Sequence, residues 1–389
     1  MASPPPQLRL RRRSPPALME ELIEEILLRL PPDEPARLVR AALVCRAWRS
    51  TVSNAAFLRR YREFHATPPL LGYLCDTLAR PRLVSTSTTR VPFFSKPAPS
   101  STSVLSWVTD CRHGRVLIDY AIEALSWFVI WDPVTGRTKH LVAPSYYASS
   151  FNAAVLCAVD GCDHLSCHDG PSRVVFVQMR FVDRQPIAQA TMYSSATNAW
   201  STTAASVAVH DSVSIGTRPN LLIGDALYFT ISFTTLKYDL GRHALSMIET
   251  PGVPRDATAI RAEHGGLGFV TVSRNCIHLI SSRQQAADGS ANIGTADAAA
   301  GGGGGWVRHR AIKLGELLPK SHARSSQPRV VGYVEGTDTV LLSAYPKVFT
   351  LDLKSRLVRK LSTHKGSFVK AYTSFYTPGI ILLYYFAEA

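Results

Sequence analysis

The 389-residue sequence lacks the features by which secreted and membrane-spanning proteins are commonly recognised. Its seven cysteines are odd in number and irregularly spaced, so they do not form the pattern of a disulfide framework. No asparagine is followed two positions later by Ser or Thr, so no N-glycosylation site is present. No apolar run approaches the roughly eighteen residues that a membrane-spanning helix needs. These absences favour an intracellular protein of the cytoplasm, the nucleus or both, with no membrane partner.

The sequence also lacks the local motifs of common enzyme classes. It has no Gly-x-x-x-x-Gly-Lys phosphate loop, no His-Glu-x-x-His motif and no Gly-x-Ser-x-Gly turn. Hydrolysis by a pair of acids would need two carboxylates that converge on one pocket. The spacing of the acids along the sequence does not establish such a pair. We therefore expect a non-catalytic protein with no catalytic residues and no cofactor. The acids near expected strand ends are typical of turn and cap positions: Asp110, Asp119, Asp132, Asp225 and Asp239.

The charge balance is basic, with 43 Lys and Arg residues against 29 Asp and Glu residues and a formal net charge of +14. Such a balance suits nucleic acid or an acidic partner. The basic residues are spread along the whole chain, which favours compositional bias over a binding site. Residues 1–16 are rich in Pro and Arg and are expected to be a disordered tail. Arg9 and the run Arg11-Arg12-Arg13 form either a nuclear localisation patch or a solvated charge run.

A helical pattern occupies residues 18–64. In its first segment the apolar residues fall on one helix face, and acidic residues occupy most of the remainder. This helix is predicted to end at Pro31 and Pro32, because proline does not continue a helix. The apolar face consists of Leu18, Leu22, Ile23, Ile26, Leu27 and Leu30.

Three shorter helices are predicted to follow. Asp33 is a suitable N-cap for the first of them, and Pro35 is tolerated because it falls in the first turn. We expect Cys45, which precedes the next helix, to be a small buried residue. A bundle this small buries little surface, so a docking partner is expected. The apolar residues of the three helices are, in order, Leu38, Val39, Ala42 and Leu43; Trp48; and Phe57, Leu58 and Tyr61.

Residues 17 to about 60 resemble the F-box. The resemblance rests on the helix that ends in Leu30-Pro31, on the Pro-Asp-Glu-Pro turn of residues 32–35, and on the run Leu43-Val44-Cys45-Arg46-Ala47-Trp48-Arg49. These motifs occur in the family's order and spacing. The family usually opens with Leu-Pro, whereas Leu18 is followed here by Met19. The apolar helix face is intact without that proline.

The resemblance implies a substrate receptor of an SCF-type cullin-RING ubiquitin ligase. In that family the F-box binds a Skp adaptor, which joins a cullin scaffold, and the rest of the chain captures a protein target for ubiquitination and degradation. Some motif residues would touch the adaptor and others would hold the helices together, and the sequence does not divide them. The alternative is an ordinary helical bundle without a partner. The expected adaptor-binding residues are Leu22, Ile26, Leu27, Leu30, Pro31, Leu43, Val44 and Trp48.

From about residue 66 the sequence changes to short β-branched and aromatic runs separated by turn residues, which is typical of an all-β domain. One phrase recurs in this region: a strand, an aromatic residue or Asp, a polar turn and a second strand. Its markers Trp131, Tyr193, Tyr238 and Phe349 are 62, 45 and 111 positions apart. These steps fit four-stranded propeller blades if one marker is skipped near residues 277–280. The clearest strands are predicted at residues 116–118, 127–131, 174–177, 226–229, 268–272, 340–342 and 348–351.

We therefore predict a multidomain chain, α then β. Residues 1–16 form the tail, residues 17–65 a three- to four-helix F-box, and residues 66–389 a target-binding β-propeller-like domain of about five or six blades. Residues 284–305, with five consecutive glycines, are predicted to be a low-complexity loop.

The last part of the predicted propeller is expected to close the ring, and two of its segments resemble a known family. The last strands, near residues 372–376 and 380–386, are expected to pair with the earliest strands and close the ring. Residues 111–140 and 218–254 resemble the propeller-like region of a large group of plant, especially grass, F-box proteins. That resemblance implies target binding and names no target. Most of the tryptophans are expected to pack in the core: Trp107, Trp127, Trp200 and Trp306.

One cluster has the residue types of a metal site. Thiolates and imidazoles within twelve residues can surround a zinc ion. The spacing is not that of a standard zinc finger, and a loop merely rich in these residues is the simpler interpretation, so no metal site is predicted. The weak candidate ligands are Cys157, Cys162, His164, Cys167 and His168.

Two alternative functions remain open. The first is a binding or regulatory protein that engages the Skp adaptor without assembling a ubiquitin ligase. The second is a basic propeller that binds nucleic acid, for which binding would depend steeply on salt concentration.

Overall fold

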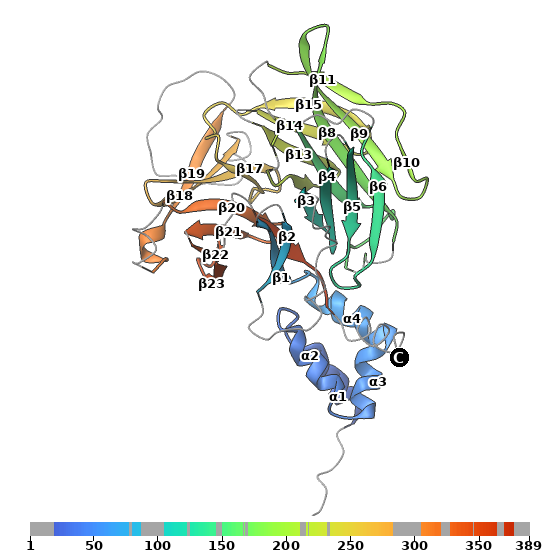
Figure 1. Cartoon of the computed structure of the whole chain (residues 1–389). Coiled ribbons are helices and arrows are strands. Elements are labelled where there is room, and N and C mark those ends of the chain that lie inside the picture. The colour runs from blue at the N-terminus through green and yellow to red at the C-terminus, as the bar shows by residue number, and fades with distance from the viewer. Residues whose placement is uncertain are drawn as a thin grey trace, which may run out of the picture.

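The structure is a computed structural model of the chain. It describes residues 19–77, 80–86, 105–122, 125–144, 150–165, 167, 170–210, 215–216, 218–231, 234–282, 305–319, 327–344, 346–363 and 369–376. Four helices are followed by a six-bladed β-propeller, so the predicted fold class is confirmed. Figure 1 shows the helices below the ring of blades.

The helices are α1 (Glu20–Leu28), α2 (Pro35–Ala42), α3 (Arg46–Ser53) and α4 (Ala55–His65), and together they form what we call the helical lobe. Two local predictions about them are wrong. The N-cap of α2 is Glu34, not Asp33, and no side chain caps that helix, because Pro35 itself occupies the first turn. Cys45 is exposed rather than buried, and its Sγ caps α3 by accepting a hydrogen bond of 3.5 Å from the Trp48 amide.

Each blade is an antiparallel sheet, and we number the blades in chain order. Blade 1 contains β24 (Val369–Thr373), β1 (Leu70–Thr77) and β2 (Arg80–Ser85). Blade 2 contains β3 (Leu105–Arg112), β4 (Arg115–Ile122), β5 (Leu125–Trp131) and β6 (Thr138–Val142). Blade 3 contains β7 (Phe151–Cys157), β8 (Ser172–Val182), β9 (Gln185–Ser194), β10 (Ala199–Trp200) and β11 (Ala205–Ala208).

Blade 4 contains β12 (Leu221–Ile223), β13 (Ala226–Ile231), β14 (Thr234–Asp239) and β15 (Ala244–Glu249). Blade 5 contains β16 (Thr258–Arg261), β17 (Leu267–Ser273), β18 (Cys276–Ser282) and β19 (Trp306–Lys313), and the short 3-10 helix η2 (Leu314–Glu316) follows it. Blade 6 contains β20 (Arg329–Val334), β21 (Thr339–Ala344), β22 (Lys347–Asp352) and β23 (Val358–Thr363).

The first of the two segments predicted to close the ring, near residues 372–376, does pair with the earliest strand. Strand β24 pairs antiparallel with β1, placing Tyr73 opposite Ala371 and Cys75 opposite Val369. The closure joins the two ends of the propeller by main-chain hydrogen bonds and covers the inner edge of β1. The second expected closing segment, residues 380–386, lies outside the described residues, as do residues 284–304 of the low-complexity stretch.

The propeller core is divided among the interfaces between blades. Each of the six neighbouring pairs of blades encloses its own cluster of buried apolar residues. Between blades 2 and 3, for example, the rings of Phe128, Phe151 and Phe176 lie 5.3–6.0 Å apart. Since every blade buries apolar surface on both sides, the ring is stable only when it is complete.

Two tryptophans pack at the interfaces between blades, which agrees with the expectation that most tryptophans lie in the core. The Trp200 indole donates a hydrogen bond of 2.8 Å to the Val142 carbonyl of the preceding blade. Trp306 donates in the same way to the Glu249 carbonyl at 3.1 Å.

The helical lobe is joined to the propeller by apolar contacts. Phe375, which follows β24, is 1% exposed and belongs to the same buried cluster as Leu27 and Tyr61. Leu165, from the loop between β7 and β8, packs against this cluster, and Val39 of α2 packs against the cluster between blades 1 and 2. Within the described residues, no helix has both the length and the apolar content that a membrane crossing requires.

Candidate functional site

Four exposed apolar side chains of the helical lobe lie on α1 and at the end of α2, and Met19 and Phe64 are exposed as well. Leu22 and Ile26, one turn apart on α1, are 46% and 48% exposed. Leu43 and Val44, at the end of α2, are 69% and 63% exposed. Large apolar side chains are rarely left in water in such number on so small a unit, and a cluster of them marks a binding surface. We call these four residues the lobe surface.

The other four residues that were expected to bind the adaptor are buried or half-buried. Leu27 is completely buried and holds α1 against the rest of the lobe. Leu30, Pro31 and Trp48 are half-buried, and Leu30 and Trp48 pack against the same cluster. The structure thus divides a set that the sequence could not divide: four side chains face outward, and the others are engaged wholly or partly inside the lobe.

Ion pairs hold α4 against α1 on the surface of the lobe. Arg60 of α4 donates to Glu24 at 2.9 Å and to Glu25, and Arg29 also donates to Glu25 at 2.7 Å. The hydrogen bond from Arg29 lowers the pKa of Glu25, burial partly opposes this, and Arg60 lowers it further. The pairs are solvent-exposed, so they orient the two helices while adding little stability.

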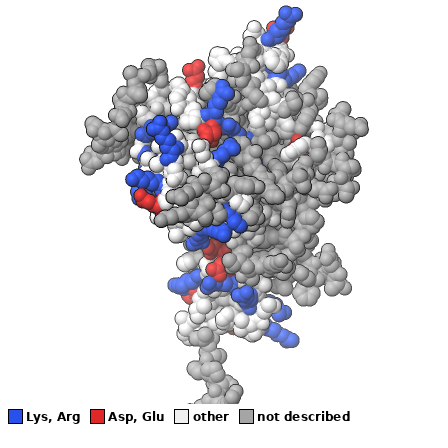
Figure 2. Space-filling view, turned by 60° about the vertical axis from the view of Figure 1, so that its left-hand side comes forward, with Lys and Arg blue, Asp and Glu red and all other residues white. Residues whose placement is uncertain are grey.

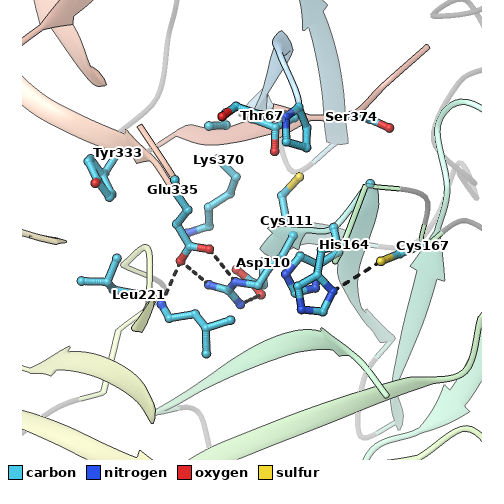
Figure 3. A pocket seen from close by; sticks show the side chains of 18 of the residues that line it. Thr67, Asp110, Cys111, His164, Cys167, Leu221, Tyr333, Glu335, Lys370 and Ser374 are labelled. Atoms are coloured by element: carbon cyan, nitrogen blue, oxygen red, sulfur yellow. Dashed lines mark hydrogen bonds and ion pairs between the residues drawn. The ribbon is translucent and has the colours of Figure 1, made fainter. Parts of the chain in front are cut away.

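A cavity of about 420 Å³ lies at the centre of the propeller, on the side that faces the helical lobe. Its lining includes residues 66–68, which connect the lobe to β1, and the closing segment at Ser374 and Phe375. Side chains from several blades point into it (Figure 3), among them Asp110, Glu335 and Lys370.

Arg112 connects the blades across this cavity. Its guanidinium donates two hydrogen bonds of 2.7 Å to Glu335 in blade 6, one of 2.7 Å to Asp110 on its own strand, and one of 2.8 Å to Asn220, which precedes blade 4. Glu335 also accepts a hydrogen bond of 2.9 Å from the Leu222 amide. A β-bulge between residues 108 and 110 sets the register that places Asp110 and Arg112 on the inner face.

This network was not predicted from the sequence. The expectation that Asp110 and Asp119 serve turns is wrong, since both are buried inside strands, whereas Asp132 and Asp239 do accept hydrogen bonds from the turn amides that follow them. Burial raises the pKa of Asp110, and the charge of Arg112 opposes that rise. Asp110 and Glu335 do converge on the cavity, but both accept from one guanidinium, an arrangement typical of a structural ion-pair network.

Four of the five weak candidate metal ligands come together at the rim of the cavity. The ligand atoms of Cys157, Cys162, His164 and Cys167 all lie within 4.8 Å of one another. The fifth candidate, His168, lies outside the described residues. Figure 3 shows His164 beside Cys167 at this rim.

His113 stacks on the cluster from the turn between β3 and β4. The rings of His113 and His164 are 3.8 Å apart and nearly parallel. Burial, reinforced by the charge of Arg112, lowers the pKa of His113 to about 2, and burial also lowers the pKa of His164. Burial therefore favours the neutral form of both imidazoles, which has a nitrogen lone pair.

On the face shown in Figure 2, the Lys and Arg side chains of the described residues form no single continuous patch. Lys and Arg side chains lie there in several separate groups with Asp and Glu among them. Mixed charges of this kind are typical of an ordinary solvated surface, whereas a nucleic-acid-binding surface typically gathers Lys and Arg in one basic patch or stripe.

Comparison with known proteins identifies the helical part of the chain. Residues 18–60 match the F-box domain family, so this segment is an F-box domain. No curated protein matches the sequence.

Several solved structures resemble the propeller at low sequence identity. A protein of unknown function from Bacteroides caccae has 9% identity and a TM-score of 0.44, with 77% of this chain and 98% of that chain covered. A chain of a nidogen/laminin complex has 8% identity and a TM-score of 0.43, covering 78% and 98%. The Dos1 propeller has 9% identity and a TM-score of 0.33, covering 65% and 59%. These similarities assign no function.

Proposed function

We propose that the protein is a substrate receptor of an SCF-type cullin-RING ubiquitin ligase. The F-box would bind a Skp adaptor and through it a cullin, and the propeller would hold a protein target. The observation that carries the proposal is the lobe surface: Leu22, Ile26, Leu43 and Val44 are exposed on a domain of the F-box family. A Skp adaptor is the partner that this family's surface binds.

The proposed mechanism is proximity rather than catalysis by this chain. A receptor that holds a target near a charged ubiquitin carrier raises the effective concentration of the target's lysines. The contacts between the F-box and the propeller, through Phe375 and Leu165, support this role, because they would hold a target bound to the propeller in one orientation relative to an adaptor bound to the F-box. We also propose that the protein belongs to the grass-type F-box proteins that its propeller resembles. Its proposed location is the cytoplasm, the nucleus or both.

The test is co-purification of a Skp adaptor and a cullin with the full chain and with an Ile26→Glu variant. Burying an Ile side chain is worth about 1.5–3 kcal/mol, so its loss together with a buried charge should weaken adaptor capture by more than tenfold. Ile26 is preferable to Leu30 as the test position, because Leu30 also packs inside the lobe. Phe181→Glu is the matched control, since Phe181 is an apolar residue of the propeller that is 69% exposed.

The outcomes separate the possible functions. Capture of adaptor and cullin that Ile26→Glu removes and Phe181→Glu preserves supports the ligase receptor. Capture of the adaptor without the cullin supports a regulatory protein outside the ligase. Failure of the intact chain to capture either partner contradicts the proposal.

A further inference from the structure

The end of β7 and the loop that follows it bring three thiols and one imidazole together, with their ligand atoms within 4.8 Å of one another. The Sγ atoms of Cys162 and Cys167 are 3.5 Å apart, and the Sγ of Cys167 is 3.5 Å from the Nδ1 of His164. With zinc–sulfur bonds of about 2.3 Å and zinc–nitrogen bonds of about 2.0 Å, neighbouring ligand atoms of a tetrahedron lie roughly 3.5–3.8 Å apart. A disulfide would require about 2.05 Å between the sulfurs.

We propose that Cys157, Cys162, His164 and Cys167 bind a structural zinc ion. Three thiolates and one neutral imidazole are a soft donor set that selects zinc over hard cations. Each thiol loses its proton on binding, and the histidine donates the lone pair of Nδ1. Since the chain supplies all four ligands, the site is closed, and its role is to hold the loop rather than to catalyse a reaction.

The backbone of the loop already favours this arrangement. Gly161 and His164 both have left-handed backbone conformations, with φ of 64° and 59°, which turn the chain back toward the end of β7. The amide of Val159 donates to the Sγ of Cys157 at 3.5 Å, and the amide of His164 donates to the Sγ of Cys162 at 3.4 Å. Amide hydrogen bonds of this kind stabilise thiolates.

A buried cation adjoins the cluster. Arg115 is 3% exposed and donates to the carbonyl of Cys167 and, at 2.8 Å, to that of Gly170. Its Nη1 has no hydrogen-bond partner in the part of the chain that the structure describes. Three thiolates and a divalent ion leave one formal negative charge on the site. That charge would compensate the buried guanidinium.

The proposed site lies where it can control the position of the F-box. Leu165, between two of the ligands, packs against the buried cluster of the helical lobe. Removing the ion should free the loop that carries Leu165 and loosen this contact.

The first experiment measures metals by mass spectrometry in the full chain, purified without chelators. We expect about one zinc per chain. Cys162→Ser and His164→Asn should lose most of it, and His164→Cys, which restores a four-ligand set, should retain it. Cys276→Ser is the matched control, because Cys276 is a half-buried cysteine of blade 5, and it should retain full zinc.

Two further measurements keep the proposal falsifiable if a variant folds poorly. Cobalt substituted into the intact chain should show the intense visible absorption of a tetrahedral thiolate site. Hydrogen exchange in residues 158–165 should rise several-fold on chelation, while exchange in β13 and β14 stays unchanged. Zinc well below one per chain, zinc that survives in Cys162→Ser and His164→Asn, another metal in its place, or a Cys162–Cys167 disulfide would overturn the proposal.

Discussion

Arg112 and Glu335, which are 223 positions apart in the sequence, are joined by two parallel hydrogen bonds of 2.7 Å across the centre of the propeller. The side chains of Arg112 and Asp110 are 3% and 5% exposed, and charges buried to this extent are costly unless each is paired. Arg112 is paired on two sides, by Glu335 and by Asp110. The ion pairs thereby couple blades 2 and 6, which main-chain pairing does not join.

Replacing Arg112 by Met should therefore be strongly destabilising. Asp110 would remain buried without its cation, at a cost of about 3–5 kcal/mol in the free energy of unfolding. The measurement is chemical denaturation of the propeller followed by tryptophan fluorescence. Arg359→Met is the control, because the ion pair of Arg359 with Asp33 is exposed, and its removal should change the free energy by less than about 1 kcal/mol. Equal effects of the two variants would show that the central network adds no stability.

The close packing of blade 6 against blade 1 depends on a glycine. A Cβ at Gly332 would lie 2.7 Å from the carbonyl oxygen of Val369 in β24, which is too close for any side chain. Gly332→Ala must push β20 and β24 apart and should cost about 1–3 kcal/mol, seen as a lower unfolding temperature. A Cβ at Gly216 meets no atom of the described residues within 4 Å, so Gly216→Ala should leave that temperature nearly unchanged. If Gly332→Ala were equally harmless, the close approach of β20 and β24 would not exist in solution.

The repeated phrase in the sequence corresponds to one structural position. Its markers lie in β5, β9, β14 and β22, each the third strand of its blade, and the skipped marker lies in β18, the third strand of blade 5. In blades 2, 4 and 6 the same turn follows this strand: Asp132, Asp239 and Asp352 each accept two amide hydrogen bonds from it. In blade 3 Ser194 and Ser195 follow the marker Tyr193 instead. In blade 5 the low-complexity stretch separates β18 from β19, so the phrase is interrupted.

Sequence patterns predict structure that is determined by residues close together in the chain. The ion-pair network at the centre of the propeller depends instead on residues that are far apart in the sequence. The strands could be predicted because alternation and turn chemistry are local. The ring closure followed from the recurring strand pattern, since a propeller must bring its last strands back to its first. Arg112 could not be identified, since its partners Asn220 and Glu335 are 108 and 223 positions away. The exposed and buried members of the F-box motif could not be separated either, because Phe375 contributes to burial of the lobe from the far end of the chain.

Phe375 is predicted to control the orientation of the F-box. Its ring lies 6.4 Å from that of Tyr61 and almost at right angles to it, inside the core of the helical lobe. Truncation of a buried Phe to Ala costs about 3–5 kcal/mol, and here that loss falls on the junction between lobe and propeller. Phe375→Ala should therefore let the lobe move, and small-angle X-ray scattering should show a larger maximum dimension.

Adaptor binding should survive the same change, because Leu22 and Ile26 are exposed and lie on α1, away from the Phe375 contact with α4. Phe181→Ala, at an exposed position of the propeller, is the control and should leave the scattering profile unaltered. A variant that binds the adaptor normally but transfers ubiquitin to its target poorly would show that orientation matters for the receptor. An unchanged scattering profile for Phe375→Ala would mean that other contacts, such as those of Leu165 and Val39, suffice to hold the lobe in place.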